Sequence, residues 1–288
     1  MRRLGPLSVT CAVLLSIGAA AHADDGRLLA TGGLTEVEGS AGGGIVPWAV
    51  ITGYGTGDQN GATAFLSHAD TGDYTLSAVG MAVGIRDRVE LSFADQDLDL
   101  GTLGTALKLP GTSLHQQIMG AKVRVIGDVV YGDWPEISLG VQYKHDLDFT
   151  IPQAVGAKHD SGTDLYTAAT KVFVGGFFDR DLVVNFTLRG TKANQLGLLG
   201  FGGDKNDSYK LEPEASLGVL LDEHTAVGLE YRQKPDNLSF AKEDAWSDFF
   251  IAYFPSKSIS LVAAYAVLGD VATLKQQRGL YLSVQAAF

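Results

Sequence analysis

Residues 278–288, RGLYLSVQAAF, carry the pattern that decides the fold. Apolar side chains at every second position, such as Leu280 and Leu282, alternate with smaller or more polar ones, such as Ser283, up to the final Phe288. Successive side chains of a β-strand point to opposite faces, so this period of two predicts a strand with one apolar and one more polar face.

The same alternation recurs along the chain and predicts about twelve strands. Short connections such as 86–88 alternate with longer ones, which include 55–73, 97–114 and 269–277. An even number of strands joined by short periplasmic turns and long extracellular loops is typical of outer-membrane barrels. The predicted strands are 45–54, 74–85, 89–93, 117–125, 136–144, 164–174, 182–189, 209–221, 227–232, 246–254, 259–268 and 278–288.

Two all-β architectures could bury such strands. In a soluble sandwich the apolar faces pack inward, whereas in a membrane barrel they meet lipid and the polar faces line the lumen. Tyrosines beside the long loops, such as Tyr143 and Tyr231, and aromatics at the opposite strand ends, such as Trp134 and Phe178, resemble the two aromatic girdles of a barrel. These features favour an all-β fold, a closed antiparallel transmembrane β-barrel.

The N-terminus predicts export. A basic start is followed by an apolar stretch and a small-residue cleavage pattern ending at Ala23, so residues 1–23 are predicted to be a cleaved signal peptide. The only cysteine, Cys11, lies within it, which leaves the mature chain without a disulfide or a cysteine-based metal site. We divide the remainder into a Gly-rich acidic segment, 24–43, and a barrel, 44–288, placed in the bacterial outer membrane.

Composition excludes several classes of protein. Lys and Arg number 22 against 33 Asp and Glu, for a net charge of −11. This charge disfavours a nucleic-acid partner, because a protein that binds nucleic acid needs a basic face. Hydrophobic residues make up 45% of the chain, too many for a disordered protein. No cofactor motif is recognisable, and no histidine pair has the spacing of metal ligands.

Strand parity predicts which charges face the lumen. The strands from 117 to 189 contribute basic residues near mid-barrel, and the next two contribute acids, which would set a transverse field across a narrow pore. The alternative is that these charges pair with one another and close the lumen. The predicted lumen and solute-binding residues are Lys122, Arg124, Lys144, Lys171, Arg189, Lys210, Glu212, Glu214, Glu230 and Arg232.

The segment 24–43 has two interpretations. Termini are often untethered, so a loose periplasmic tail is the default. Its acids, among them Glu36 and Glu38, could instead enter the barrel and pair with Lys and Arg on the wall, so that the segment acts as a plug.

Several motifs resemble a proteobacterial outer-membrane β-barrel family of unknown function, DUF3034. They span nearly all of the mature chain, and the resemblance implies an outer-membrane location without an established activity. The motifs are GRLLATGG at 26–33, EG at 38–39, GGG at 42–44, VPWA at 46–49, GYGT at 53–56, DRVELS at 87–92, GAKVR at 120–124, GVQYK at 140–144, GLLGFGG at 197–203 and KPDNL at 234–238.

These observations predict a non-enzymatic, porin-like channel for passive diffusion of small polar or anionic solutes. Three alternatives remain open. The first is a barrel that takes up hydrophobic compounds through a side opening near the glycines of 78–84, with the N-terminal segment as its plug. The second is a closed structural or adhesive barrel. The third, and the weakest, is a hydrolase at the rim that uses His115, His145 and nearby acids.

The sequence also predicts the partners of such a barrel. They are outer-membrane lipid and lipopolysaccharide, small solutes, and the barrel assembly machinery, which would engage the C-terminal strand that ends at Phe288.

Overall fold

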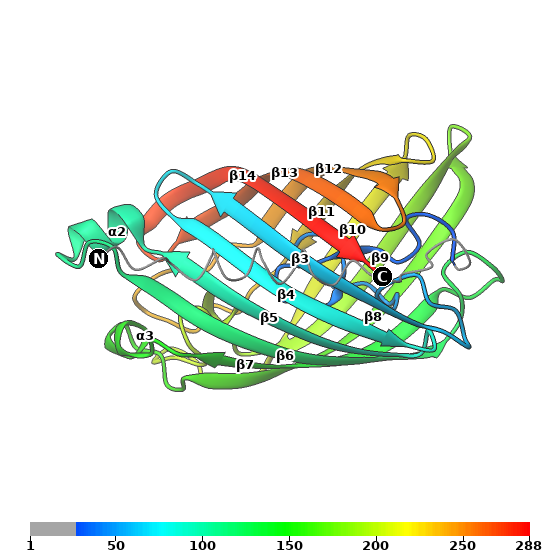
Figure 1. Cartoon of the computed structure of the whole chain (residues 1–288). Helices are drawn as coiled ribbons and strands as arrows, with labels where there is room; N and C mark the ends of the chain where they lie inside the picture. Colours follow the sequence, from blue (N-terminus) through cyan, green and yellow to red (C-terminus); the bar gives the residue numbers. More distant parts are fainter. Residues whose placement is uncertain (1–26) are drawn as a thin grey trace, which may run out of the picture.

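Twelve long strands, β3 to β14, close into one antiparallel barrel in the computed structural model, which describes residues 27–288 (Figure 1). The predicted signal peptide lies outside the described residues. The strands are β3 (Asn60–Asp70), β4 (Thr75–Ile85), β5 (Val89–Asp99), β6 (Ser113–Ile126), β7 (Glu136–Asp146), β8 (Ser161–Phe177), β9 (Arg180–Thr191), β10 (Lys210–Leu220), β11 (Thr225–Arg232), β12 (Trp246–Ser256), β13 (Ile259–Val271) and β14 (Leu274–Ala287).

Each strand pairs with its neighbours in sequence, and β14 pairs with β3 to close the barrel. Closure leaves no free sheet edge, which is the condition for a sheet to span hydrocarbon. The pairing of β4 is continuous on both sides across Ala78–Gly84, so the described wall has no break in strand pairing where the uptake alternative places its side opening. Among the described residues, no helix is both long and apolar enough to cross a membrane.

The two faces of the strands differ as the alternation predicts. On β14, Leu282 points outward and is 57% exposed, whereas its neighbours Tyr281 and Ser283 are buried in the lumen. The same holds on β11 for outward Leu229 and inward Glu230. An exposed apolar belt around a closed barrel is the lipid-facing surface of an outer-membrane protein. The prediction of a closed twelve-stranded barrel is confirmed.

The first predicted strand, residues 45–54, is wrong. These residues form no barrel strand and are buried throughout, and the barrel begins instead at Asn60 with β3, inside the stretch predicted as a long loop. The run 45–54 is apolar because it is enclosed on all sides, and a continuous apolar run does not distinguish an enclosed segment from a strand. In β3 the inward Phe65 is apolar, which obscures the alternation.

The predicted alternation of short and long connections is only partly right. Residues 71–74 and 272–273 are short turns at the end of the barrel where the long loops lie, because β3 and β13 run further than the sequence indicates. Two short helices, α2 (Gly101–Ala106) and α3 (Thr150–Ala154), mark this long-loop end in Figure 1. The C-terminus lies at the opposite, short-turn end of the barrel, where β14 ends and β3 begins. Pro213, which has no backbone N–H to donate, stays in register with Leu188.

Candidate functional site

The lumen is occupied by the chain itself. We call residues 27–55 the lumen segment; within it, every residue from Leu34 to Tyr54 is buried. Two short strands, β1 (Leu34–Thr35) and β2 (Ala41–Gly42), pair to form a hairpin. The described part of the segment is therefore not a loose tail, because its backbone and its acids bond to inward-facing residues of the wall.

Glu38 lies at the centre of these contacts. Its carboxylate forms ion pairs with Lys144 and with Arg232, at 2.8 Å, and lies 3.7 Å from Arg189. Burial raises the pKa of Glu38, whereas the positive charges of Arg232, Lys144 and Arg189 lower it. The effect of the cations is the larger, so the pKa falls to about 2. Glu38 is thus a fixed negative charge that joins three separate strands to the lumen segment.

Glu36 differs from its neighbour. It accepts a hydrogen bond from the Gln142 side chain at 2.8 Å, and its nearest cation, Arg232, is 3.6 Å away. Burial, together with the negative charge of Glu38, raises the pKa of Glu36 to about 8. Glu36 is therefore protonated at neutral pH, and only one of the two acids holds the segment by charge.

The wall completes the charges around Glu38. Arg189 pairs with Glu214 at 2.5 Å and with Asp164 at 3.3 Å, and Asp164 also pairs with Lys144 at 2.7 Å. Arg232 lies 3.4 Å from Glu214. Such a buried network is stable only when every charge is matched, because each unpaired ion carries a large desolvation penalty. We call these residues the central charge cluster: Glu36, Glu38, Lys144, Asp164, Arg189, Glu214 and Arg232.

Two further contacts hold the lumen segment by its backbone. Lys122, paired with Glu90 at 3.2 Å, donates to the carbonyl oxygens of Ala41 and Trp48, while Glu90 accepts from the amides of Ala41 and Thr52. These bonds satisfy buried backbone groups that a short hairpin cannot satisfy alone.

On the other side of the lumen, Glu230 accepts from the amides of Gly44 and Ile45 at 2.6 and 2.9 Å. A side chain at Gly43 would overlap the Glu230 carboxylate. The glycine run at 42–44 therefore lets the backbone approach the wall.

Apolar contacts also hold the lumen segment. Val37, Ile45 and Trp48 of the lumen segment belong to one cluster with Phe250 and Val262 of strands β12 and β13. The segment presents its acids to Lys144, Arg189 and Arg232 of β7, β9 and β11. Its Trp48 lies against β10, where the indole donates a hydrogen bond to Ser216 at 2.9 Å. Burial of each large apolar side chain contributes roughly 1.5–3 kcal/mol to holding the segment in place.

A second segment closes the long-loop end of the lumen. Residues 193–203 of the loop between β9 and β10 are all buried. They include the 3₁₀ turn η1 (Asn194–Gly197), in which Gln195 and Leu196 have φ of 45° and 63°. Lys144 donates to the carbonyl oxygen of Leu196 at 3.1 Å, so the central charge cluster holds both segments. Non-glycine residues in this region of φ are strained and persist only where the surrounding contacts enforce them.

The predicted lumen residues fall into three groups. Lys122, Lys144, Arg189, Glu214, Glu230 and Arg232 are brought together around the lumen segment, and Glu212 is buried nearer the long-loop end of β10. Arg124 lies at the short-turn end, 2.8 Å from Asp87. Lys210 has the inward parity of Glu212 and Glu214 but lies at the exposed start of β10, and the assignment of Lys171 is corrected below.

Lys171 does not face the lumen. On β8 the buried inward positions are those of Asp164 and Thr170, so Lys171 has the opposite parity. Its ammonium donates to backbone carbonyl oxygens of the 127–135 turn, the nearest being that of Gly132 at 2.7 Å. Lys210 is exposed at the start of β10. The outward face of β8 mixes the apolar Leu165 and Phe173 with Thr167, so its alternation does not show plainly which face meets lipid.

The sequence prediction missed Asp164 and Asp248, which also face inward. Both lie on strands whose alternation is irregular, but each shares parity with buried neighbours, for example Tyr166 for Asp164. That parity was the available signal.

The predicted rim residues do not form a shared centre. His115 contacts Asp97 at 3.0 Å and Asp148 at 2.5 Å, so both ring nitrogens bond to carboxylates, and His145 lies 3.9 Å from Asp160. Within residues 27–288, no group of three or more His, Cys, Asp or Glu side chains is arranged to hold a metal.

Solved outer-membrane barrels share this fold. The KdgM porin superposes with a TM-score of 0.50 at 11% identity, covering 78% of this chain and 99% of the porin, and KdgM in complex with disordered oligogalacturonate does so equally. The NanC porin gives 0.48 at 9% identity, covering 79% and 98%. Outer membrane phospholipase A from Escherichia coli gives 0.42 at 9% identity, covering 82% and 94%. At these identities the likeness shows the fold alone.

A family assignment comes from the sequence. No curated protein matches this chain. The model of the family described as "Protein of unknown function (DUF3034)" matches residues 31–285, which include the lumen segment from Thr31 and the barrel strands up to the last two residues of β14. The chain therefore belongs to the DUF3034 family.

Proposed function

We propose that this protein is a gated outer-membrane channel for small polar or anionic solutes, closed at rest by its own lumen segment. The single observation that carries the proposal is the placement of Glu38, which neutralises a basic patch on the wall formed by Lys144, Arg189 and Arg232. Without the segment, three cations would face two wall carboxylates, Asp164 and Glu214. A narrow pore with an excess of positive charge favours anions.

The loop 193–203 is the second segment that closes the lumen. Because Lys144 bonds both to Glu38 and to the carbonyl oxygen of Leu196, displacement of the lumen segment also removes part of the support of this loop. Opening therefore requires that both segments move, and the resting protein conducts little.

A planar-bilayer experiment tests this proposal with four proteins. They are the full mature chain, a variant without residues 27–55, a variant with residues 194–200 replaced by a Gly-Ser linker, and the combination. We expect few current steps from the full chain and regular anion-selective steps from the combined variant. Shortening the exposed loop 105–110 is the matched control and should leave the current unchanged.

Charge reversal then tests selectivity. In the combined variant, Lys122→Glu, Arg124→Glu and Lys144→Glu together should convert anion preference into cation preference. If the folded combined variant passes no current, the barrel is not a channel and the alternative of a closed structural barrel, which the packed lumen also fits, replaces it. If it conducts but ignores the charge reversal, anion selectivity is wrong.

A further inference from the structure

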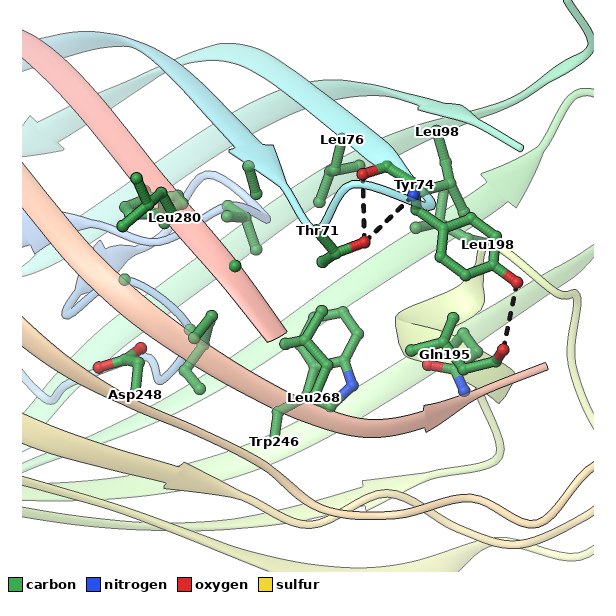
Figure 2. A pocket seen from close by; sticks show the side chains of 18 residues that line it. Thr71, Tyr74, Leu76, Leu98, Gln195, Leu198, Trp246, Asp248, Leu268 and Leu280 are labelled. Atoms are coloured by element: carbon green, nitrogen blue, oxygen red, sulfur yellow. Dashed lines mark hydrogen bonds between the residues drawn. The ribbon is translucent and has the colours of Figure 1, made fainter. Parts of the chain in front are cut away.

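An apolar cavity lies inside the long-loop end of the barrel (Figure 2). In this view Tyr74, Leu98 and Leu198 gather at one end, Leu280 and Asp248 lie at the other, and Trp246 lies between them. Its volume is ≈ 70 Å³. On this measure roughly 10–15 Å³ holds one water molecule, so the cavity has room for several waters or for one small organic molecule.

Three polar groups on the cavity wall have no hydrogen-bond partner. They are the indole Nε1 of Trp246, the amide Nε2 of Gln195 and the Oδ1 of Asp248. These residues are only 6%, 2% and 7% exposed, respectively. Buried polar atoms are almost always hydrogen-bonded, and each unpaired one costs free energy. Three of them on one cavity therefore indicate a ligand that supplies the missing partners.

Contacts outside the cavity fix two of these groups in place. Lys234 lies 4.6 Å above the Trp246 ring, donates to Oε1 of Gln195 at 2.7 Å and pairs with Glu243 at 3.0 Å. With Oε1 engaged by Lys234, the amide of Gln195 has its donor group free. The site is thus built before any ligand arrives, and Lys234 acts as a positioning residue.

The chemistry of the lining selects the class of ligand. Trp246 and Gln195 offer hydrogen-bond donors, Asp248 offers an acceptor, and the remaining wall is almost wholly apolar. A hydroxyl group both accepts and donates, so it can meet either kind of partner. A carboxylate is disfavoured, because Asp248 and the nearby Glu230 would repel it.

We propose that this cavity binds a small uncharged amphiphile, a phenol or a short-chain alcohol, with its apolar body against Leu98, Leu198 and Leu268. This site is separate from the central charge cluster and does not depend on the channel being open. Leu280, which borders the cavity, lies on the outer face of β14, and the inward positions around it are the small residues Ala69, Ala266 and Gly279. The cavity is therefore separated from the outside of the barrel by a thin wall.

Diffraction from crystals of the unmodified protein soaked in 4-bromophenol tests the site directly. We expect an anomalous bromine peak within the cavity and a hydroxyl near Trp246, Gln195 or Asp248. A cavity that holds only ordered water, or a bromine found only at other sites, would overturn the proposal. This measurement needs no variant and so does not depend on the folding of one.

Calorimetric titration measures selectivity in detergent micelles with phenol, toluene and benzoate as probes. We expect phenol to bind, benzoate not to bind, and Trp246→Phe to weaken phenol about fivefold, the loss of roughly one hydrogen bond, with no change for toluene. Ala266→Leu fills the cavity and should abolish binding, whereas Ala263→Leu on the lipid-facing side of the same strand should not. Equal phenol binding by the protein and Ala266→Leu would reject the site even if the channel proposal stands.

Discussion

Glu38 is the single side chain that joins the lumen segment to the most strands. Replacing it with glutamine leaves Lys144, Arg189 and Arg232 buried with one fewer anion, and breaking a buried ion pair costs roughly 3–5 kcal/mol. We expect Glu38→Gln to lower the free energy of unfolding in micelles by that amount, measured by urea titration and read from tryptophan fluorescence because Trp48 lies in the lumen segment. Glu36→Gln is the matched control and should not lower the free energy of unfolding at pH 7, since the pKa of about 8 keeps this carboxyl neutral in the folded protein and glutamine imitates the neutral form. Equal losses for the two variants would contradict the assigned charges.

Glu36 also predicts how stability depends on pH. Its pKa is raised by burial and by Glu38 from 4.5 to about 8 in the folded protein. A group of this kind contributes stability that is fully present below pH 4.5 and is lost as the pH rises through 8. The free energy of unfolding should therefore fall by roughly 2–3 kcal/mol between pH 6 and pH 9. Glu36→Gln, measured in the same way, should remove this fall, and a fall that persists in the variant would assign it to another group.

At the scale of elements, the sequence predicts strands well wherever one face is lipid and the other is lumen. Strands such as β10 and β14 alternate cleanly because their outward side chains meet hydrocarbon and their inward ones meet polar groups. This alternation does not apply to the lumen segment. Residues 45–54 are enclosed on every side, so they are apolar without alternation and resemble a strand.

For the site residues, the sequence predicts which side chains face the lumen but not which partners they contact there. Parity alone places Lys122, Lys144 and Arg232 inside the barrel, because it depends only on local strand geometry. Their partners depend on where Glu38 sits, at a sequence separation of 106 residues from Lys144 and 194 from Arg232. Such a contact follows from the folded path of the lumen segment, which no local period encodes. The cavity beside Trp246 is harder still to predict, since it is formed by packing among six strands and two enclosed segments.

At the scale of the whole molecule, the exposed apolar belt requires that the barrel stand in lipid. Leu282 on β14 is 57% exposed and lies well inside the strand, and an arginine near the middle of the bilayer costs roughly 2–4 kcal/mol. Leu282→Arg should lower the stability of the protein in phospholipid vesicles by this amount, measured by urea unfolding. Leu107→Arg, at a residue that is 49% exposed beside α2 in a long loop, should cost almost nothing because that site is wet. Equal, small effects at both positions would mean that the belt does not contact hydrocarbon, and the inward assignment of the lumen charges would then lose its physical basis.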